Sequence, residues 1–219
     1  MATMIDTIGN AAGVLVDRHI AQSNGDRPAL RYGTKRYAYH DVAALMNRAG
    51  NMLRQLGVEP RQRVLIALPP SPAGIASILG AMKIGAVPVL AAASDAGSKL
   101  ATAINELDPR VVIAEAARAA EIGSAAGNRP VIVVGGDAAP QRSFVDLLRS
   151  SPSSLPCAAV DEGAWAVAVL AASGLRHATH AAVRQADQGS GTDLSTTDGW
   201  NVGEVLAVFA RGGEASLRG

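Results

Sequence analysis

A serine and two histidines lie close together near residue 175, and they are the first residues to consider for chemistry. Ser173, His177, His180 and Asp187 are the residue types of a nucleophilic triad. However, Ser173 is not in a Gly-x-Ser-x-Gly elbow, and the two histidines, three residues apart on an expected helix at 175–188, favour surface positions. The two histidines are also incomplete as a metal site, because no carboxylate or cysteine lies at the sequence spacing expected of a third ligand. We therefore expect no catalytic triad and no metal centre here.

Two glycine-containing segments are candidates for phosphate binding. Residues 189–192 read Gly-Ser-Gly-Thr, but they follow no convincing strand, so a plain flexible loop is favoured. Residues 135–137 read Gly-Gly-Asp and follow an apolar run, at the kind of strand end where α/β folds often bind ligands. A simple turn explains this second segment equally well.

Four other conspicuous side chains have plain structural interpretations. Trp165 and Trp200 are expected to pack against their neighbours rather than to serve as stacking platforms. Lys83 and Arg48 are expected on the solvated faces of helices.

The composition restricts the class of protein. The 219 residues include 20 basic and 19 acidic side chains, with no basic stripe or aromatic ladder, so a nucleic acid partner is not expected. Cys157 is the only cysteine, which excludes an internal disulfide or a cysteine metal cluster and favours a reducing compartment. Residues 1–10 lack the basic start and apolar core of a signal peptide. We therefore expect a cytoplasmic protein.

The elements that must position these side chains are organised around residues 57–91. Apolar runs typical of strands buried on both faces occur at 64–68, 87–90, 110–114 and 130–134. Helices are predicted between them at 72–84, 98–107 and 116–126, with Ser71 as the cap and Pro72 in the first turn of the first one. Strands that alternate with helices predict an α/β fold with a largely parallel sheet flanked by helices.

The segments on either side of this core complete the predicted architecture. Before it we expect a helix at 10–21, an edge hairpin of strands 29–32 and 36–39, and a helix from 40 that ends at Gly57. After it we expect a helix at 143–149, a boundary loop at 150–156, a strand at 164–172, a mobile loop at 184–199, a helix at 202–210 and a strand stub at 214–217. We therefore divide the chain into a domain at 1–156 and an incomplete second unit at 161–219.

A membrane span at 72–94 is the rival interpretation of the central stretch, since Lys83 is its only charge. Gly85 and Pro88 divide the apolar run into segments shorter than the roughly 20 residues that cross a bilayer. We expect no membrane association.

Several phrases in the first 115 or so residues resemble one enzyme family. They are NAAGVLVDRHIAQSNGDRPALRYG, Tyr37-Ala38-Tyr39 before a helix with Asn47-Arg48-Ala49, LGVEPRQRVLIALPPSP, and LGAMKIGAVPVL. In this order they resemble the adenylate-forming enzymes, and within them the aromatic acyl-CoA ligases such as benzoate-CoA ligase. The resemblance implies the N-terminal subdomain of the acyl-CoA synthetase fold, ATP with magnesium and CoA as cofactors, and activation of an aromatic carboxylate.

The family's catalytic signature is where this sequence departs from the pattern. The family has an apolar strand, then a Ser/Thr/Gly-rich loop ending in Pro-Lys-Gly, then a basic or histidine-containing stretch. Here the strand leads to Ser173-Gly174 and directly to residues 175–180, Leu-Arg-His-Ala-Thr-His. By resemblance, Ser173 and Gly174 are the vestige of the phosphate loop and His180 matches the stretch toward the substrate, while no catalytic residue can be carried over.

Three interpretations of function follow. The first is a truncated relative of the aromatic acyl-CoA ligases without ligase activity on its own. The second is a binding or assembly module that docks on a full-length ligase or on itself through the apolar surface that loss of the remaining enzyme would expose. The third, a decayed gene product without a selected role, is not separable from the second by sequence.

Overall fold

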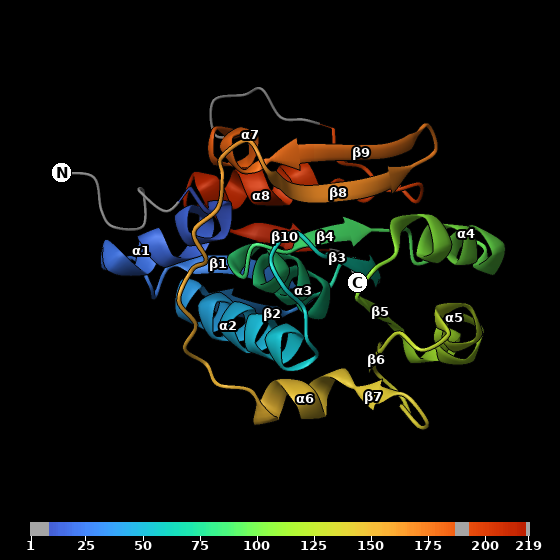
Figure 1. Cartoon of the computed structure of the whole chain (residues 1–219). Coiled ribbons are helices and arrows are strands. Elements are labelled where there is room, and N and C mark those ends of the chain that lie inside the picture. Colours follow the sequence, from blue (N-terminus) through green and yellow to red (C-terminus); the bar gives the residue numbers. More distant parts are fainter. Residues whose placement is uncertain (1–8, 187–192, 218–219) are drawn as a thin grey trace.

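A seven-stranded sheet runs through the protein, whose computed structural model describes residues 9–186 and 193–217 (Figure 1). The strands, in spatial order, are β7 (Arg142–Ser143), β6 (Val131–Val134), β5 (Val111–Glu115), β3 (Arg63–Ala67), β4 (Val87–Leu90), β8 (Trp165–Ala171) and β9 (Gly174–Thr179). Every neighbouring pair is parallel except β8 and β9, which form an antiparallel hairpin. The predicted α/β class with a largely parallel sheet is confirmed.

Helices cover both faces of this sheet. Successive side chains of a strand point to opposite faces, and in β3 Val64 and Ile66 belong to one hydrophobic cluster while Leu65 and Ala67 belong to the other. The first cluster includes α2 (Tyr39–Gln55), α3 (Pro72–Lys83) and α8 (Val202–Ala210), and the second includes α4 (Gly97–Leu107) and α5 (Ala119–Ala126). The short elements are η1 (Gly13–Asp17), α1 (Arg18–Ala21), η2 (Ala116–Arg118), α6 (Phe144–Ser150) and α7 (His180–Arg184).

Helix α3 is buried on all sides, because α2 packs over it on the side away from the sheet. As predicted, it begins with Ser71 as the cap, whose Oγ accepts a hydrogen bond from the Gly74 amide at 3.1 Å, and with Pro72 in the first turn. A helix enclosed in this way is apolar around its whole circumference. No helix in the described ranges combines the length and the apolarity that crossing a membrane requires.

The N-terminal hairpin belongs to a second, smaller sheet rather than to the edge of the main one. Its strands β1 (Pro28–Tyr32) and β2 (Lys35–Ala38) are joined by a two-residue turn, since Tyr32 pairs with Lys35. The last strand, β10 (Ala215–Leu217), lies parallel to β1 on its other side. The part after residue 161 therefore contributes strands to both sheets, and the predicted division of the chain into two domains stays a prediction.

The predicted helix at 175–188 is wrong in its first part. Residues 174–179 form β9, and the helix α7 begins only at His180. The reason is long-range, because pairing with β8 gives the backbone of 174–179 hydrogen-bond partners that a local reading of this alanine-containing stretch does not anticipate. Of the predicted loop at 184–199, residues 187–192 lie outside the described residues, while Ser195 and Asn201 form an isolated β-bridge.

The predictions that Lys83 and Arg48 are solvated are also wrong. Lys83 is 2% exposed, because the last turn of α3 lies between the sheet and α2. Arg48 is half-buried, and its Nη1 donates to the carbonyl oxygens of Leu148, Arg149 and Ser151 at 2.8–3.3 Å. It thereby satisfies carbonyl groups that the end of α6 leaves without helical partners.

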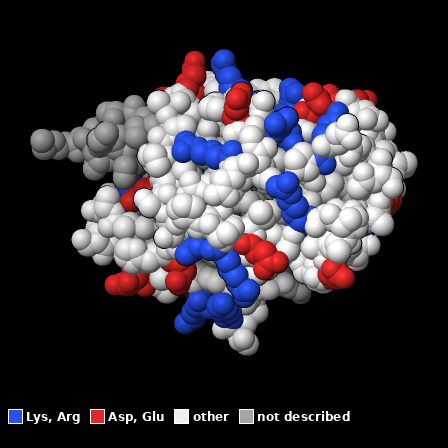
Figure 2. Space-filling model, turned by 60° about the horizontal axis from the view of Figure 1, so that its bottom comes forward, with Lys and Arg blue, Asp and Glu red and all other residues white. Residues whose placement is uncertain are grey.

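The surface carries mixed charge and few large apolar side chains. Figure 2 shows one face on which acidic and basic side chains are interspersed. Among the described residues, the large hydrophobic side chains that are exposed are Val145 on α6, at 45%, and Leu175 on β9, at 37%. These two elements lie at opposite edges of the molecule (Figure 1), so the large apolar side chains of the described residues do not gather into the exposed patch that the sequence led us to expect.

Candidate functional site

The turn between β8 and β9 is the place where the sequence predicts the vestige of a phosphate loop. Ala171 pairs with Gly174, so Ala172 and Ser173 alone form the turn. Ser173 and Gly174 are both exposed, and Gly174 has a φ of +112°, which suits glycine. Loops that bind phosphate surround its oxygens with several successive backbone N–H groups. A two-residue hairpin turn does not offer such a concavity.

The cation that follows the turn already has a partner. Nη1 of Arg176 lies 2.7 Å from Oδ2 of Asp193, and both side chains are about half exposed. The Ser195 hydroxyl, which donates to Oδ1 of Asp193 at 2.6 Å, and the Arg176 guanidinium lower the pKa of this carboxyl. The Arg176 cation of the hairpin is therefore already neutralised by Asp193 and is not free to neutralise a bound phosphate.

The carboxyl end of the neighbouring strand, β4, is also covered by polar contacts. Asp95, in the loop that follows β4, is 8% exposed. Its carboxylate accepts hydrogen bonds from the Ala92 amide at 3.2 Å, from Lys99 Nζ at 2.8 Å and from Thr197 Oγ1 at 2.7 Å. Because Thr197 belongs to the segment before α8, this contact ties that segment across the carboxyl end of β4.

His180 lies at the other end of the hairpin. The five residue steps of β9, from Gly174 to Thr179, span roughly 17 Å at about 3.4 Å each, and His180 lies beyond them. The structure therefore does not bring His180 together with Ser173 and Gly174. It is the first residue of α7 and is 1% exposed. Its Nδ1 accepts a hydrogen bond from the Ala11 amide at 3.1 Å. Burial, with a smaller contribution from Arg184, lowers its pKa to about 4, so it is neutral at pH 7 with its proton on Nε2.

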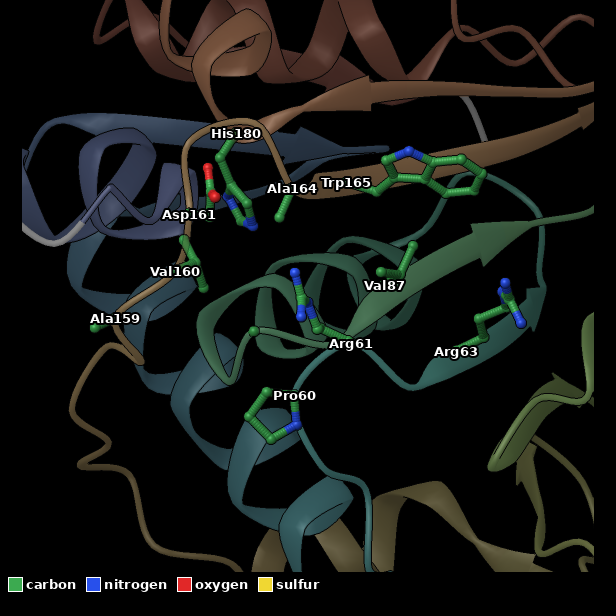
Figure 3. Close-up of a pocket in the computed structure, with 11 residues that line it drawn as sticks. Pro60, Arg61, Arg63, Val87, Ala159, Val160, Asp161, Ala164, Trp165 and His180 are labelled. Atoms are coloured by element: carbon green, nitrogen blue, oxygen red, sulfur yellow. The ribbon is translucent and has the colours of Figure 1, made fainter.

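The imidazole of His180 borders a cavity of about 450 Å³ (Figure 3). The lining residues are Pro60, Arg61, Arg63, Gly85, Val87, Ala159, Val160, Asp161, Ala164, Trp165 and His180. Arg63, Val87 and Trp165 are the first residues of β3, β4 and β8, so the cavity lies at the amino ends of the parallel strands. Ligands of open α/β sheets usually bind at the carboxyl ends. This pocket is on the opposite side from the place where the sequence suggested a nucleotide site.

The remaining candidates from the sequence are not brought together. His177 stacks on Trp165, with ring centroids 3.9 Å apart and planes at 16°, so Trp165 does form a stack, with a side chain of its own chain. Trp200 packs against the first hydrophobic cluster, and its Nε1 is buried without a hydrogen-bond partner among the described residues. Asp187 and the segment 189–192 lie outside the described residues. Within the described ranges, no group of three or more His, Cys, Asp or Glu side chains is placed to hold a metal ion.

Sequence reasoning missed a buried polar cluster around Lys83. Its Nζ lies 2.7 Å from Oδ2 of Asp17 and 2.7 Å from Oδ1 of Asn47. The Cys157 thiol donates to the same carboxylate at 3.3 Å, and burial, followed by the charge of Asp17, raises the pKa of that thiol to about 12. Cys157 is therefore no nucleophile near neutral pH. The signal for this cluster was the single charge in an otherwise apolar stretch.

Comparisons with known proteins agree with the geometry of the scaffold. The family model described as AMP-binding enzyme matches residues 17–173 and so ends in the hairpin turn. The 3-hydroxybenzoate–CoA ligase of Aromatoleum sp. (strain CIB) is 33% identical over 165 residues, which cover 71% of this chain and 31% of that ligase. The 3-hydroxybenzoate–CoA/4-hydroxybenzoate–CoA ligase of Thauera aromatica is 39% identical over 80 residues, or 36% of this chain and 15% of that protein.

Solved structures share the fold. The anthranilate CoA ligase AuaEII in complex with anthranoyl-AMP has a TM-score of 0.82 at 20% identity, covering 95% of this chain and 44% of its own. A benzoate CoA ligase from Burkholderia xenovorans LB400 has a TM-score of 0.81 at 21% identity, covering 95% of this chain and 45% of its own. The chain thus spans about a third of the first curated relative and less than half of these structures.

Proposed function

Because this chain belongs to the family of AMP-binding enzymes, as its resemblance predicted, we propose that it carries the N-terminal scaffold of an aromatic acyl-CoA ligase and does not form acyl-adenylate by itself. The aromatic substrate class is supported by the curated ligases for 3-hydroxybenzoate and 4-hydroxybenzoate that match this chain. The inactivity is supported by the geometry at the end of β8.

The ancestral reaction has two steps with clear requirements. A carboxylate oxygen attacks the α-phosphorus of ATP, the bond to pyrophosphate breaks, and an acyl-adenylate forms. The thiol sulfur of CoA then attacks the carbonyl carbon, AMP leaves and the thiol proton is released. The first step needs groups that stabilise negative charge as pyrophosphate departs, and in such sites these groups are preorganised donors or cations.

The residues of the hairpin do not fit ATP with its magnesium ion. The single observation that carries the proposal is the pairing of Ala171 with Gly174, which leaves a turn of two residues. The next cation, Arg176, is engaged by Asp193 at 2.7 Å. No step through ATP can therefore be assigned to residues at this position.

ATP–pyrophosphate exchange tests the proposal. The purified chain would be assayed with benzoate, 3-hydroxybenzoate, 4-hydroxybenzoate and anthranilate, and ATP binding would be measured by calorimetry with magnesium present. We expect exchange no faster than in the protein-free blank and no saturable heat of nucleotide binding. Robust exchange would overturn the proposal. In that case Ser173→Ala would show whether the turn takes part, and exposed Ser124→Ala on α5 serves as its matched control.

We propose a non-catalytic assembly role as the second candidate, because β9 is an edge strand of the main sheet. An edge strand presents unpaired backbone groups to which another strand can add. The first candidate partner is a second copy of the chain, whose β9 could pair edge to edge with this one. A full-length ligase is the other candidate. Light scattering would detect the dimer, and Leu175→Lys on β9 should dissociate it while Val145→Lys on α6 should not. A monomer at every concentration that also fails to bind a full-length ligase would contradict this role.

A further inference from the structure

The pocket at the amino ends of β3, β4 and β8 has the features of a binding site that is separate from any nucleotide chemistry. Its volume of about 450 Å³ lies in the range of small-molecule sites, roughly 300–1,000 Å³. It is formed by the turn before β3, the turn before β4 and the segment that leads into β8. Three segments that are distant in the sequence therefore converge on one cavity.

Two hydrogen-bond donors face this cavity, and neither has a partner among the residues that the structure describes. His180 is 99% buried, its Nδ1 is occupied by the Ala11 amide, and no partner for Nε2 is found in the described part of the chain. Among those same residues, the Arg61 guanidinium has neither a hydrogen bond nor a carboxylate within ion-pair distance. Figure 3 shows the Arg61 side chain and the His180 ring pointing toward one another across the cavity.

The backbone holds Arg61 in this direction at some conformational cost. Its φ is +69°, a left-handed conformation that is unfavourable for arginine. The Arg61 amide donates to the Gly85 carbonyl oxygen at 2.7 Å, which fixes the turn against the one before β4. Residues kept in such a conformation gather at functional sites.

The other walls indicate what kind of anion fits. Pro60, Val87 and Val160 offer apolar surface, and Trp165, whose ring stacks on His177, also lines the pocket (Figure 3). Asp161 also borders the pocket, with its carboxylate held by the Gly163 amide at 2.8 Å, so the local positive charge is modest. Arg63 donates to the Leu107 carbonyl oxygen at 3.0 Å and is directed away. This balance favours a monoanion with an apolar body over a phosphate dianion.

We infer that this pocket binds a small organic carboxylate, with the carboxylate between Arg61 and His180 Nε2 and an apolar body of about one ring against Val87, Val160 and Trp165. The inference does not rest on the proposed ligase ancestry, because it needs neither ATP nor the hairpin turn. The chemistry is that of charge-assisted hydrogen bonding, in which a guanidinium and an N–H donor share one carboxylate.

Titration with benzoate in the absence of nucleotide tests the inference, with benzamide as the uncharged analogue of the same shape. We expect saturable benzoate binding in amide NMR spectra, with the largest shifts at Gly85 and Ala164, and binding of benzamide at least about tenfold weaker, since one charge-assisted hydrogen bond is worth that factor or more. Shifts confined to other regions, equal binding of the two compounds, or no saturation by about 20 mM would overturn it.

Two variants assign the binding to the named donors. Arg61→Asn removes the guanidinium and places in the left-handed turn a residue that tolerates it, so it should fold as well as the parent chain and weaken benzoate at least about tenfold. His180→Asn should weaken it by a smaller factor. Arg142→Asn, an exposed arginine on β7 at the far edge of the sheet, is the matched control and should leave binding unchanged. Unaltered benzoate affinity in folded Arg61→Asn would contradict the inference.

Discussion

Replacing Lys83 by methionine is the sharpest test of how the central helix is held in place. The substitution keeps the length and the apolar stem of the side chain but removes the cation that lies 2.7 Å from Asp17 and 2.7 Å from Asn47. Among the described residues, the remaining hydrogen-bond donor from a side chain to the Asp17 carboxylate would then be the Cys157 thiol, at 3.3 Å. A carboxylate that is mostly enclosed and has lost its cation is costly.

The expected loss follows from the exposure of the two partners. Removing one member of a fully buried ion pair costs about 3–5 kcal/mol. The side chain of Lys83 is 3% exposed but that of Asp17 is 21% exposed, so the remaining carboxylate keeps some contact with water. We therefore expect the free energy of unfolding to fall by about 2–3 kcal/mol, which for a chain of this size lowers the melting temperature by about 4–12 °C.

Urea unfolding followed by circular dichroism measures this loss, and Lys35→Met is the matched control. Lys35 is exposed, with Nζ 4.8 Å from the Tyr37 ring centroid, so its replacement should cost less than about 1 kcal/mol. The double variant Lys83→Met/Asp17→Leu should recover much of the stability, because it removes both charges together. The reasoning is refuted if Lys83→Met costs no more than Lys35→Met, or if the double variant is no more stable than the single one.

Three other perturbations test separate parts of the structure. Burial lowers the pKa of His180 to about 4 from an ordinary 6.5, so between these pH values the histidine binds a proton in the unfolded state but not in the folded state. The free energy of unfolding should therefore fall by about 3 kcal/mol from pH 6.5 to pH 4, and His180→Asn should lack this loss when unfolding is measured as a function of pH. Gly80→Ala should lower the free energy of unfolding by about 1–2 kcal/mol, because the new Cβ would lie 2.7 Å from the backbone of α2. Gly123→Ala, whose Cβ would meet a flexible side chain at 2.9 Å, should stabilise the protein slightly when both variants are compared by thermal melting. At pH 8 a thiol reagent should label Cys157 at least about a hundredfold more slowly than free cysteine. Asp17→Asn should accelerate the labelling, since the Asp17 carboxylate helps to raise the pKa of the thiol. Rapid labelling of the unmodified chain would contradict this expectation.

The scaffold was predictable because its strands and helices have local signals. Continuous apolar runs located β3 to β6 and β8, and Ser71-Pro72 located the start of α3. What failed depended on partners distant in the sequence. Residues 174–179 become a strand only because β8 lies beside them, and β10 pairs with β1 from the other end of the chain. The strand stub expected at 214–217 is present as β10, but nothing in that segment indicates β1 as its partner.

The candidate sites were predictable to a smaller extent for the same reason. The sequence singled out Ser173, Gly174 and His180 together, yet an extended strand holds the first two far from the third. His180 is buried because the Ala11 amide and the segment before β8 enclose it, and no spacing near His180 encodes that. Arg61 had no signal at all, since its role rests on a positive φ and on the direction of one side chain.

The short turn after β8 also explains how the scaffold can persist without the family's loop. The sheet is completed by pairing between β8 and β9, from Trp165 with Thr179 to Ala171 with Gly174, and none of these pairs requires a long connection. Each doubling of the length of a connection costs only about 0.6 kcal/mol in chain entropy, so the length of this turn has little influence on the stability of the sheet. A two-residue turn in place of the loop that the resemblance implies would therefore leave every pairing between β8 and β9 intact. A folded chain with an intact sheet is therefore compatible with the absence of exchange activity that we propose.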